Sequence, residues 1–315
     1  MMYKTYNTNL NCLNDYLDEH GVAVIPNILT EDECLYYRNN IWDELEHVTQ
    51  NRFDINNLDT WNEFYNLNPL QSMLLHHYSL GHMQPIWNIR QHPNVYQVFE
   101  KIWDTSVNDL LVSFDGLSIH LPPEKTNRGW YESNWFHTDQ SSKKIGKHCI
   151  QGLINLYPVN DGDATLSILK DSHFKHESFF KDNQIINSSD WYQLKDNDLD
   201  YFKSCESQAI KADIGSMILW DSRTFHQGIQ SGPNREYENF RMAIYITMMP
   251  RSSITDPKAL IKKQKAFKNL RITSHWANGN FLFPKKPNNY SIPNNFNLIH
   301  QPILNEIGKR LAGFD

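Results

Sequence analysis

The sequence lacks any apolar run that approaches 18 residues, the shortest length expected of a transmembrane helix. The opening stretch, MMYKTYNTNLNC, also lacks the apolar segment that a secretion signal requires. We therefore expect a cytoplasmic protein with no membrane partner.

Cysteine is scarce, and basic residues are not in excess. The four cysteines, Cys12, Cys34, Cys149 and Cys205, form no CxxC pair, so neither a disulfide framework nor a cysteine-zinc site is predicted. The chain carries 36 acidic residues against 30 basic ones, which gives a formal net charge of −6. Because nucleic-acid-binding proteins usually present a concentrated basic surface, we expect no nucleic-acid partner.

Length and composition are those of an ordinary globular protein. With 315 residues, 40% of them hydrophobic, the chain can form a large core. The length alone is compatible with one domain or two, because β-barrels and sandwiches reach about 250 residues as single domains.

The first third of the chain is predicted to be helical with one short strand, GVAVIPNIL at 21–29. Thr30 can cap a helix over 31–49, and Glu33 can complete a capping box. The helical spacing there involves Leu35, Arg38, Ile41, Trp42, Leu45 and Val48. A second helix begins at Pro93 and carries one apolar face, formed by Val95, Val98, Phe99 and Ile102.

From residue 110 the pattern changes to short apolar or alternating runs bounded by turn residues. These runs cover 110–123, 148–159, 164–173, 216–228 and 240–250. Because long helical segments do not separate each pair, an antiparallel sandwich or barrel is favoured over a βαβ fold. The predicted fold class is α+β, with a mainly β core over 110–250 and a helical segment over 1–109 that packs on it.

Two further segments lie outside the β pattern. Residues 174–208 form a polar insertion with scattered aromatic residues, and its length suggests a lid or a covering loop. Residues 251–315 are predicted to contain a basic helix, followed from Ser274 by an irregular tail rich in proline and asparagine. We expect the lysines of that helix to lie on a solvent-exposed face: Lys262, Lys263, Lys265 and Lys268.

The segment Asn134-Trp135-Phe136-His137-Thr138-Asp139 carries the strongest chemical signal. On a strand, His137 and Asp139 project to the same side, because side chains alternate. His226, at the end of a later apolar run, offers a third ligand. Two histidines and one carboxylate form the facial triad of non-heme Fe(II) oxygenases, although an HxD pair alone often arises by chance. The same three residues also suit catalytic zinc.

Arg241 stands at the start of a nearly wholly apolar run, FRMAIYI. A buried guanidinium is costly unless an anion meets it, and its fork can hold a carboxylate through two parallel hydrogen bonds. We predict that Arg241 binds the far carboxylate of 2-oxoglutarate, and a salt bridge to an acidic residue of the fold is the alternative. Arg235, in a turn-like context, is predicted to face solvent.

The order of these motifs resembles the phytanoyl-CoA dioxygenase family of Fe(II)/2-oxoglutarate oxygenases, from Gly21 to about Pro250. After the HxD pair come a strand pair that ends in Ser172-His173, then Gly215-Ser216-x-x-x-Trp220, then His226-x-Gly228, and then Phe-Arg-x-Ala-Ile from Phe240. The resemblance implies a double-stranded β-helix, a jelly-roll or cupin-like barrel with flanking helices, in one oxygenase domain over 1–315. It also implies Fe(II) on His137, Asp139 and His226, with the cosubstrate 2-oxoglutarate on Arg241.

Other candidate site residues follow from strand alternation and from the tail. Gln151, Leu153 and Asn155 share one face of a predicted strand. If that face is the barrel interior, Gln151 or Asn155 can bind the cosubstrate or substrate; hydrogen bonds to backbone or buried water are equally open. The tail residues His275 and Trp276 can fold over the mouth of the site.

Together these patterns predict a dioxygenase that hydroxylates a small organic or acyl substrate, consumes 2-oxoglutarate and O2, and releases succinate and CO2. Asp139 is the carboxylate that related halogenases replace, so hydroxylation or a similar oxidation is expected. Two alternative functions stay open: a non-catalytic β-barrel binding protein that has kept the fold, and a zinc hydrolase that uses the same triad. The sequence predicts neither the substrate nor the oligomeric state.

Overall fold

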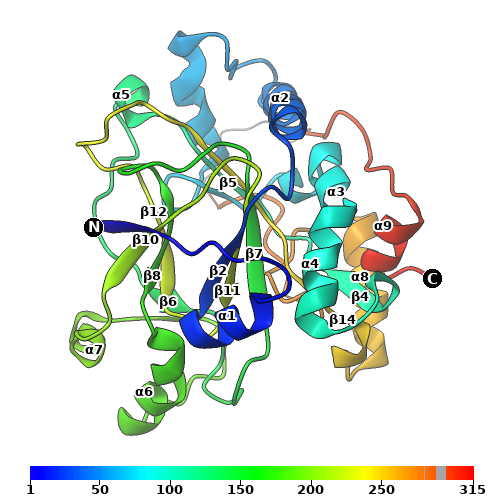
Figure 1. Ribbon diagram of the computed structural model, residues 1–315. Helices are drawn as coiled ribbons and strands as arrows, with labels where there is room; N and C mark the ends of the chain where they lie inside the picture. The colour runs from blue at the N-terminus through cyan, green and yellow to red at the C-terminus, as the bar shows by residue number, and fades with distance from the viewer. Residues whose placement is uncertain (280, 289–295) are drawn as a thin grey trace.

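The computed structural model describes residues 1–279, 281–288 and 296–315. Two six-stranded sheets and a two-stranded one form the β part of the molecule (Figure 1). All strand pairs of the three sheets are antiparallel except the outermost pair of β1 with β10. The predicted mixed fold with antiparallel sheets is therefore confirmed.

The sheets are built from strands that lie far apart in the sequence. The first sheet has the order β1 (Met2–Thr5), β10 (Ser207–Lys211), β8 (Thr165–Leu169), β12 (His226–Ile229), β6 (His137–Thr138), β9 (Tyr192–Gln193). The second has the order β2 (Val22–Ile25), β11 (Met217–Asp221), β7 (Ile150–Asn155), β13 (Arg241–Tyr245), β5 (Leu117–His120), β3 (Leu74–Leu75). The small sheet pairs β14 (Met248–Pro250) with β4 (Leu110–Val112).

From β5 to β13 the chain passes repeatedly from one large sheet to the other. β5, β7, β11 and β13 lie in the second sheet, whereas β6, β8, β10 and β12 lie in the first. Residues of both sheets meet in a buried apolar cluster between them, which includes Leu153, Leu166, Ile168, Ile218 and Ala243. Apolar side chains alone do not fill this space, because β7 and β13 also direct polar residues into it, as described below.

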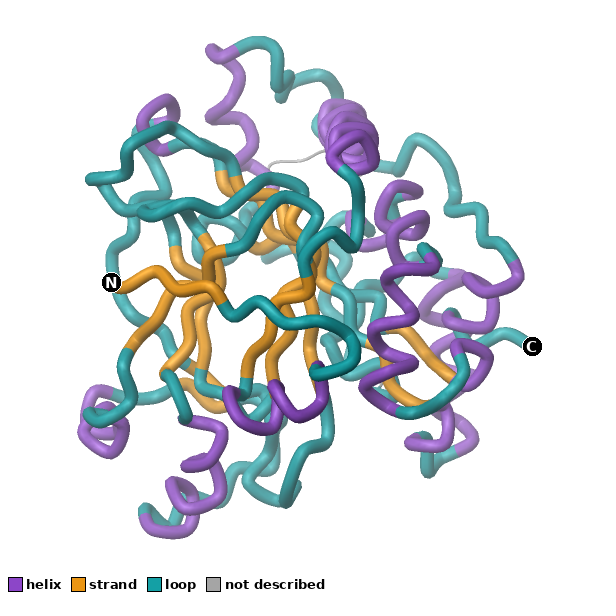
Figure 2. Tube along the Cα trace, viewed as in Figure 1, coloured by secondary structure: helices purple, strands orange, loops and turns teal. Residues whose placement is uncertain are grey.

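Nine helices surround these sheets in the described part of the chain, and most of them cover the outer face of the second sheet. The longer ones are α1 (Leu13–His20), α2 (Glu31–Val48), α4 (Pro93–Trp103) and α8 (Pro257–Lys268). The shorter ones are α3 (Gln84–Arg90), α5 (Pro123–Thr126), α6 (His176–Asp182), α7 (Asp196–Leu199) and α9 (Glu306–Leu311). In Figure 2, α3, α4, α8 and α9 gather on one side of the sheets, whereas α6 and α7 lie beneath the first sheet.

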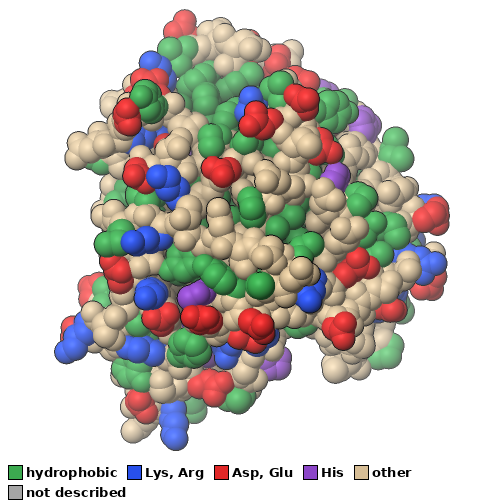
Figure 3. All heavy atoms as spheres, viewed as in Figure 1, with side chains coloured by type: hydrophobic (Ala, Val, Ile, Leu, Met, Phe, Trp, Pro, Cys, Tyr) green, Lys and Arg blue, Asp and Glu red, His purple; other side chains and the backbone are tan. Residues whose placement is uncertain are grey.

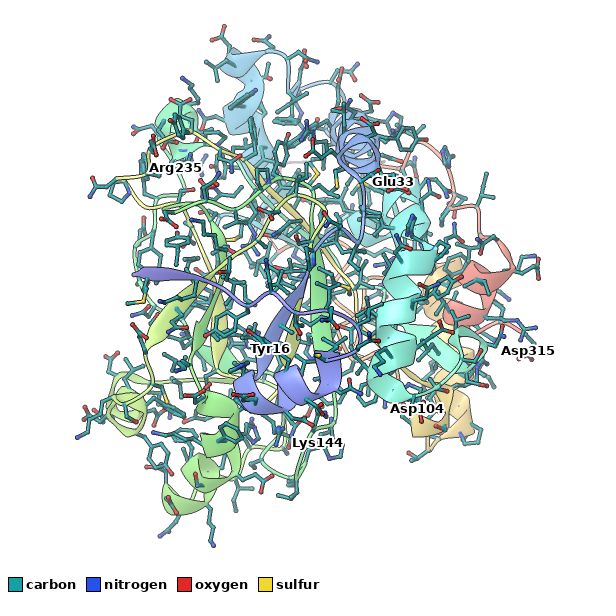
Figure 4. The ribbon with its side chains drawn as sticks, viewed as in Figure 1. Tyr16, Glu33, Asp104, Lys144, Arg235 and Asp315 are labelled. Carbon is teal, nitrogen blue, oxygen red and sulfur yellow. The ribbon has the colours of Figure 1, made fainter. Side chains whose placement is uncertain are left out.

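Local sequence signals explain the helices that the sequence predicted. Thr30 and Glu33 form the expected capping box at the start of α2, where Figure 4 labels Glu33. Pro93 opens α4, whose four predicted apolar residues are all buried. On α2 the predicted stripe is buried at Ile41 and Leu45, but Leu35 is 44% exposed, because the buried face of the first turns runs through Cys34 and Tyr37 instead.

Several predicted boundaries differ from the structure. The segment 1–109, predicted to be helical with one strand, supplies three strands to the two sheets. The insertion at 174–208 contains α6, α7 and the edge strand β9. Lys263 of α8 is buried rather than solvated, and its Nζ donates to the carbonyl of Val112 at 2.5 Å. The irregular tail gains α9, and its residues 280 and 289–295 lie outside the described residues.

No helix among residues 1–279, 281–288 and 296–315 is long and apolar enough to span a membrane. On the face drawn in Figure 3, acidic and basic side chains are interspersed, and no large area of one charge is seen there.

Candidate metal centre

Strand pairing brings the two predicted metal histidines together. His137 of β6 lies directly opposite His226 of β12, and their ring centroids are 4.4 Å apart. Asp139 follows β6 by one residue, and its backbone N–H donates to the carbonyl of Ser222 at 3.1 Å. The ligand atoms of the three residues lie within 4.8 Å of one another, and all three residues are buried. This spacing is suitable for one metal ion.

The backbone fixes the orientation of both imidazoles. The Nδ1 atom of His226 lies 2.9 Å from the carbonyl of Thr224, and that of His137 lies 3.3 Å from the carbonyl of Trp135. A carbonyl oxygen can only accept, so each Nδ1 carries the proton. Each Nε2 therefore directs a lone pair toward Asp139, at 3.3 Å from its Oδ2 for His226 and 3.8 Å for His137. Such outer hydrogen bonds are typical of metal-ligating histidines.

The protonation states also suit a metal. Burial, together with the neighbouring His226, lowers the pKa of His137 to about 4, so its imidazole is neutral at pH 7. Burial alone would raise the pKa of Asp139, but the surrounding His275, His137 and His226 hold it well below its ordinary value. Neutral imidazole and ionised carboxylate are the forms that bind metal ions.

Gln151 donates a hydrogen bond to the carboxylate of Asp139. Its Nε2 donates to Oδ2 of Asp139 at 2.9 Å, from the buried inner face of β7. The predicted interior position of Gln151 therefore leads to a contact with a triad residue, and that contact can orient Asp139.

Aromatic residues cover the two histidines. The ring of Trp135 stacks on His137 at a centroid distance of 4.7 Å and an interplanar angle of 14°. Trp191, in the insertion, lies 6.1 Å from the same imidazole. The insertion also adds β9 beside β6, where Gln193 pairs with His137. The segment 174–208 thus lies against the candidate metal centre on the side of His137.

Arg241 is buried in the same inter-sheet space without an acidic partner among the described residues. It is 3% exposed, and its Nη1 contacts Sδ of Met73 at 3.1 Å and the carbonyl of Thr165 at 3.3 Å. Its Nε atom is buried with no hydrogen-bond partner in the described chain. Burial lowers the pKa of this guanidinium, whereas the adjacent Tyr245 raises it. An anion would therefore complete its surroundings.

Two other polar atoms near Arg241 also have no partner among the described residues. They are Nδ2 of Asn155 and Oγ of Ser118, and both are buried. Ser118 and Asn155 flank Ala243 on the strands either side of β13. Because buried polar groups are normally hydrogen-bonded, this part of the interior is suited to a small polar molecule.

The prediction that Arg235 faces solvent is wrong. Its side chain is 2% exposed and makes ion pairs with Glu124 at 2.6 Å and Asp163 at 3.0 Å. Figure 4 places Arg235 at the edge of the molecule beside α5, in the loop that precedes β13. The turn residues around Arg235 correctly predicted a loop. They could not predict the ion pairs of its side chain, because both carboxylate partners are distant in sequence.

The sequence did not single out His76 and Asp115. His76 Nε2 lies 3.5 Å from Oδ1 of Asp115, and His275 Nδ1 lies 3.9 Å from Oδ2 of Asp139. His275 was predicted only to fold over the mouth of the site. The one available signal was Asp115 itself, a carboxylate between two apolar runs that precedes Gly116.

Comparisons with known proteins agree with this architecture. No known family model matches the sequence. "Ava biosynthesis cluster protein O" from Aspergillus versicolor is 27% identical over 274 residues, which cover 83% of this chain and 85% of the relative. "Putative phytanoyl-CoA dioxygenase" from Dictyostelium discoideum is 22% identical over 290 residues, which cover 80% of this chain and 78% of the relative.

A solved structure shares the fold along almost the whole chain. The crystal structure of the hypothetical protein JW0805 from Escherichia coli matches with a TM-score of 0.66 at 12% identity. The match covers 98% of this chain and 86% of that protein. The extent of the match means that the N-terminal and C-terminal segments belong to the shared fold, as the β core does.

Proposed function

We propose that this chain, which is similar to a putative phytanoyl-CoA dioxygenase, is an Fe(II)- and 2-oxoglutarate-dependent dioxygenase of a phytanoyl-CoA dioxygenase-like family. It oxidises a small organic or acyl substrate with O2, most simply by hydroxylation, and releases succinate and CO2. His137, Asp139 and His226 hold the iron, and Arg241 holds the far carboxylate of 2-oxoglutarate.

The placement of Arg241 relative to His226 carries this proposal. Gly228 lies two residues beyond His226 on β12, so both face the same side, about 7 Å apart at about 3.3 Å per residue. A Cβ atom on Gly228 would lie 3.6 Å from Nη1 of Arg241. The guanidinium is thus one strand repeat away from the triad, a separation that a five-carbon dicarboxylate can bridge.

The strand order supports the finer assignment of the fold. The chain alternates between two four-stranded sets, β5-β13-β7-β11 and β6-β12-β8-β10. This alternation supports our assignment of the fold as a double-stranded β-helix of the jelly-roll type. We assign residues 1–315 to one oxygenase domain. In it 1–109 and 251–315 support the core, and 174–208 covers the metal centre.

Each residue of the site has a defined task in this proposal. When bound, Fe(II) with 2-oxoglutarate supplies the oxidising chemistry that couples decarboxylation to substrate oxidation. The triad leaves coordination positions open for the cosubstrate and O2. Gln151 orients Asp139, whereas Ser118 and Asn155 offer hydrogen bonds beside Arg241. Trp135 and the insertion exclude water from the centre.

The proposal is tested by substrate-independent turnover of 2-oxoglutarate in the presence of Fe(II). We expect succinate formation by the unaltered protein and its loss in Asp139→Ala and His226→Ala, because each substitution removes a metal ligand. His148→Ala is the matched control, since His148 is exposed and its Nε2 donates to the nearby carbonyl of Ile145. Normal turnover in both triad variants would overturn the proposal.

Metal and cosubstrate binding separate the proposal from its two alternatives. A zinc hydrolase would retain zinc after purification and would not bind 2-oxoglutarate, which leaves the buried Arg241 unexplained. A non-catalytic binding protein would show no 2-oxoglutarate binding in an anaerobic calorimetric titration with Fe(II). We expect binding of one 2-oxoglutarate per chain, and a loss of that binding in Arg241→Leu but not in Arg251→Leu, which removes a partly exposed arginine paired with Asp315.

A further inference from the structure

Four polar side chains connect the metal triad to Arg241, and we call them the polar wall: His275, Asp115, His76 and Tyr245. At one end, Nδ1 of His275 lies 3.9 Å from Oδ2 of Asp139. At the other end, the Tyr245 side chain interacts with the guanidinium of Arg241. The wall therefore borders the space between the proposed iron and cosubstrate sites.

Contacts within the wall run from one member to the next. His275 and Asp115 interact electrostatically, and Asp115 Oδ1 lies 3.5 Å from His76 Nε2. The rings of His76 and Tyr245 have centroids 6.4 Å apart. The four residues come from three separate parts of the chain: the stretch 76–115 that precedes β5, the end of β13, and the segment that follows α8. The core and the C-terminal segment thus meet at this wall.

Backbone geometry holds Asp115 and His76 in contact. The N–H of Gly116 donates to Oδ1 of Asp115 at 2.7 Å. A Cβ on Gly116 would lie 2.6 Å from Cδ2 of His76 and 2.1 Å from the carbonyl of Leu75. Only glycine permits this approach of the strand β3 end to β5.

The wall has hydrogen-bonding capacity that the described chain does not use. Nδ1 of His76 and Nε2 of His275 are both buried without a hydrogen-bond partner among the described residues. Buried polar atoms are normally paired, so these two nitrogens indicate a missing partner. A metal ion is a poor candidate, because among the described residues only the triad brings three ligand atoms within 4.8 Å.

Charge around the wall favours an uncharged ligand group. Asp115 is 7% exposed, and burial raises the pKa of its carboxyl to about 6, so it is an anion at pH 7. The buried guanidinium of Arg90, which donates to the carbonyl of Asp115 at 2.8 Å, balances this charge. Burial lowers the pKa of His76 to about 4, which leaves its imidazole neutral.

Aromatic surface adjoins the wall on its outer side. Phe283 stacks on His76 with a centroid distance of 4.4 Å and an interplanar angle of 25°. Phe281, 5.2 Å from Phe283, is 61% exposed. A ligand that reaches the two unpaired nitrogens from this side would pass a flat apolar surface, to which an aromatic body is suited.

We propose that the polar wall is the head-group site for the primary substrate, and that it binds an uncharged hydroxyl or amide group attached to an aromatic body. This proposal rests on the proposed function, because it places the substrate beside the 2-oxoglutarate that extends from the triad to Arg241. His76 and His275 supply the hydrogen bonds, Asp115 fixes the ring of His76, and Phe283 contacts the aromatic body.

The test compares three probes with one aromatic body: 2-phenylethanol, phenylacetamide and ethylbenzene. Their affinities are measured by ligand-observed NMR titration under nitrogen, with Fe(II) and 2-oxoglutarate present. We expect the hydroxyl and amide probes to bind at least about tenfold more tightly than ethylbenzene, because a site built for a hydrogen bond disfavours the analogue that lacks it. Equal affinities, or no binding of any probe, would overturn the proposal.

Two variants test whether the wall causes the preference. His76→Phe keeps a ring for Phe283 to stack on but removes both nitrogens, and we expect it to abolish the tenfold difference. His275→Leu tests the second nitrogen independently, in case the first variant does not fold. His77→Phe is the matched control, because His77 bonds the carbonyl of Pro284 instead of the wall. A preference that persists in both wall variants would contradict the proposal.

The probe titration repeated without Fe(II) and 2-oxoglutarate, together with the calorimetric titration of 2-oxoglutarate described above, distinguishes this proposal from the proposed function. If the protein binds no 2-oxoglutarate but still prefers the hydroxyl and amide probes, the proposed function fails and the head-group site stands. If 2-oxoglutarate binds normally and the three probes bind equally, the proposed function stands and the head-group site fails.

Discussion

Gly228 shows at the scale of one residue how the cosubstrate space is kept open. A Cβ there would lie 3.5 Å from Sδ of Met73 and 3.6 Å from Nη1 of Arg241, which are ordinary contact distances. Alanine therefore fits, but the branched side chain of valine would enter the space in front of the guanidinium. Gly228 therefore contributes to cosubstrate binding because it has no side chain to occupy the space in front of Arg241.

We predict that Gly228→Val raises the KM for 2-oxoglutarate at least about tenfold, equivalent to about 1.4 kcal/mol of lost binding. Gly228→Ala is expected to change it by less than about threefold. Steady-state succinate assays check both values, and an Fe(II) titration checks that the triad still binds metal. An unchanged KM in Gly228→Val would show that the cosubstrate does not lie beside Arg241.

The role of a residue could be predicted when the signal lay in its local sequence, and could not be predicted when it depended on a partner far away in the sequence. His137 and His226 were recognisable because each stands within a local pattern, and Arg241 because a cation opens an apolar strand. Arg235 was not, since its buried side chain depends on Glu124, which lies 111 positions away. His76 belongs to the same class, because its partner Asp115 meets it only after β3 has paired with β5.

At the scale of elements, the insertion 174–208 is held by an aromatic cluster rather than by regular structure. Phe179, Phe180 and Phe202 of the insertion pack with Phe225, which directly precedes His226. Phe179 is fully buried, and its ring centroid lies 5.6 Å from that of Phe225. The cluster thus connects the insertion 174–208 to β12, the strand that begins with the proposed metal ligand His226.

We predict that Phe179→Ala destabilises the protein by about 3–5 kcal/mol, because it removes a buried ring and leaves a cavity. Urea unfolding followed by circular dichroism measures the loss. Phe174→Ala is the control, since Phe174 of the same insertion is 63% exposed and its loss is expected to cost little. Equal stability of the two variants would mean that the cluster does not anchor the insertion.

Elements with a strong local signal were predicted, and very short ones were not. The capping box of α2 and Pro93 of α4 encode helix starts within a few residues. β3, β6 and β9 have two residues each, too few for an alternating pattern to be read. Their conformation is imposed by the neighbouring strand, as the pairing of Gln193 with His137 illustrates.

At the scale of the whole molecule, buried histidines make stability depend on pH. Burial lowers the pKa to about 4 for His76, His120 and His137 and to about 3 for His82, against an ordinary value of 6.5. Between pH 6.5 and 4 the unfolded chain therefore binds more protons than the folded one at these four positions. Stability must fall as pH falls through that range.

Asp115 opposes this trend but does not reverse it. Its pKa is raised to about 6 from an ordinary value of 3.8, so the folded protein takes up that proton first and gains stability on acidification. Burial also raises the pKa of Glu44, but it lowers the pKa of His173 and His176 as well, so two raised carboxyls act against six lowered imidazoles. Asp139 adds to the acid sensitivity only below its ordinary pKa, since its folded value is depressed and its contribution is complete above that pH.

We predict that Tm falls by at least about 5 °C between pH 7 and pH 4.5. A pKa that differs by one between the folded and the unfolded chain corresponds to about 1.4 kcal/mol of stability, and several groups act together. Calorimetric scans of the metal-free protein at constant ionic strength measure this. His82→Phe is expected to flatten the dependence of Tm on pH, since it removes the histidine with the lowest pKa of the four. Phenylalanine suits this position because the His82 ring already lies 5.2 Å from the ring of Phe114, in a packed aromatic site. His148→Phe, at an exposed position, is expected to leave the slope unchanged. A Tm that rises or stays constant on acidification would show that carboxyl groups, and not the buried histidines, dominate the proton balance of folding.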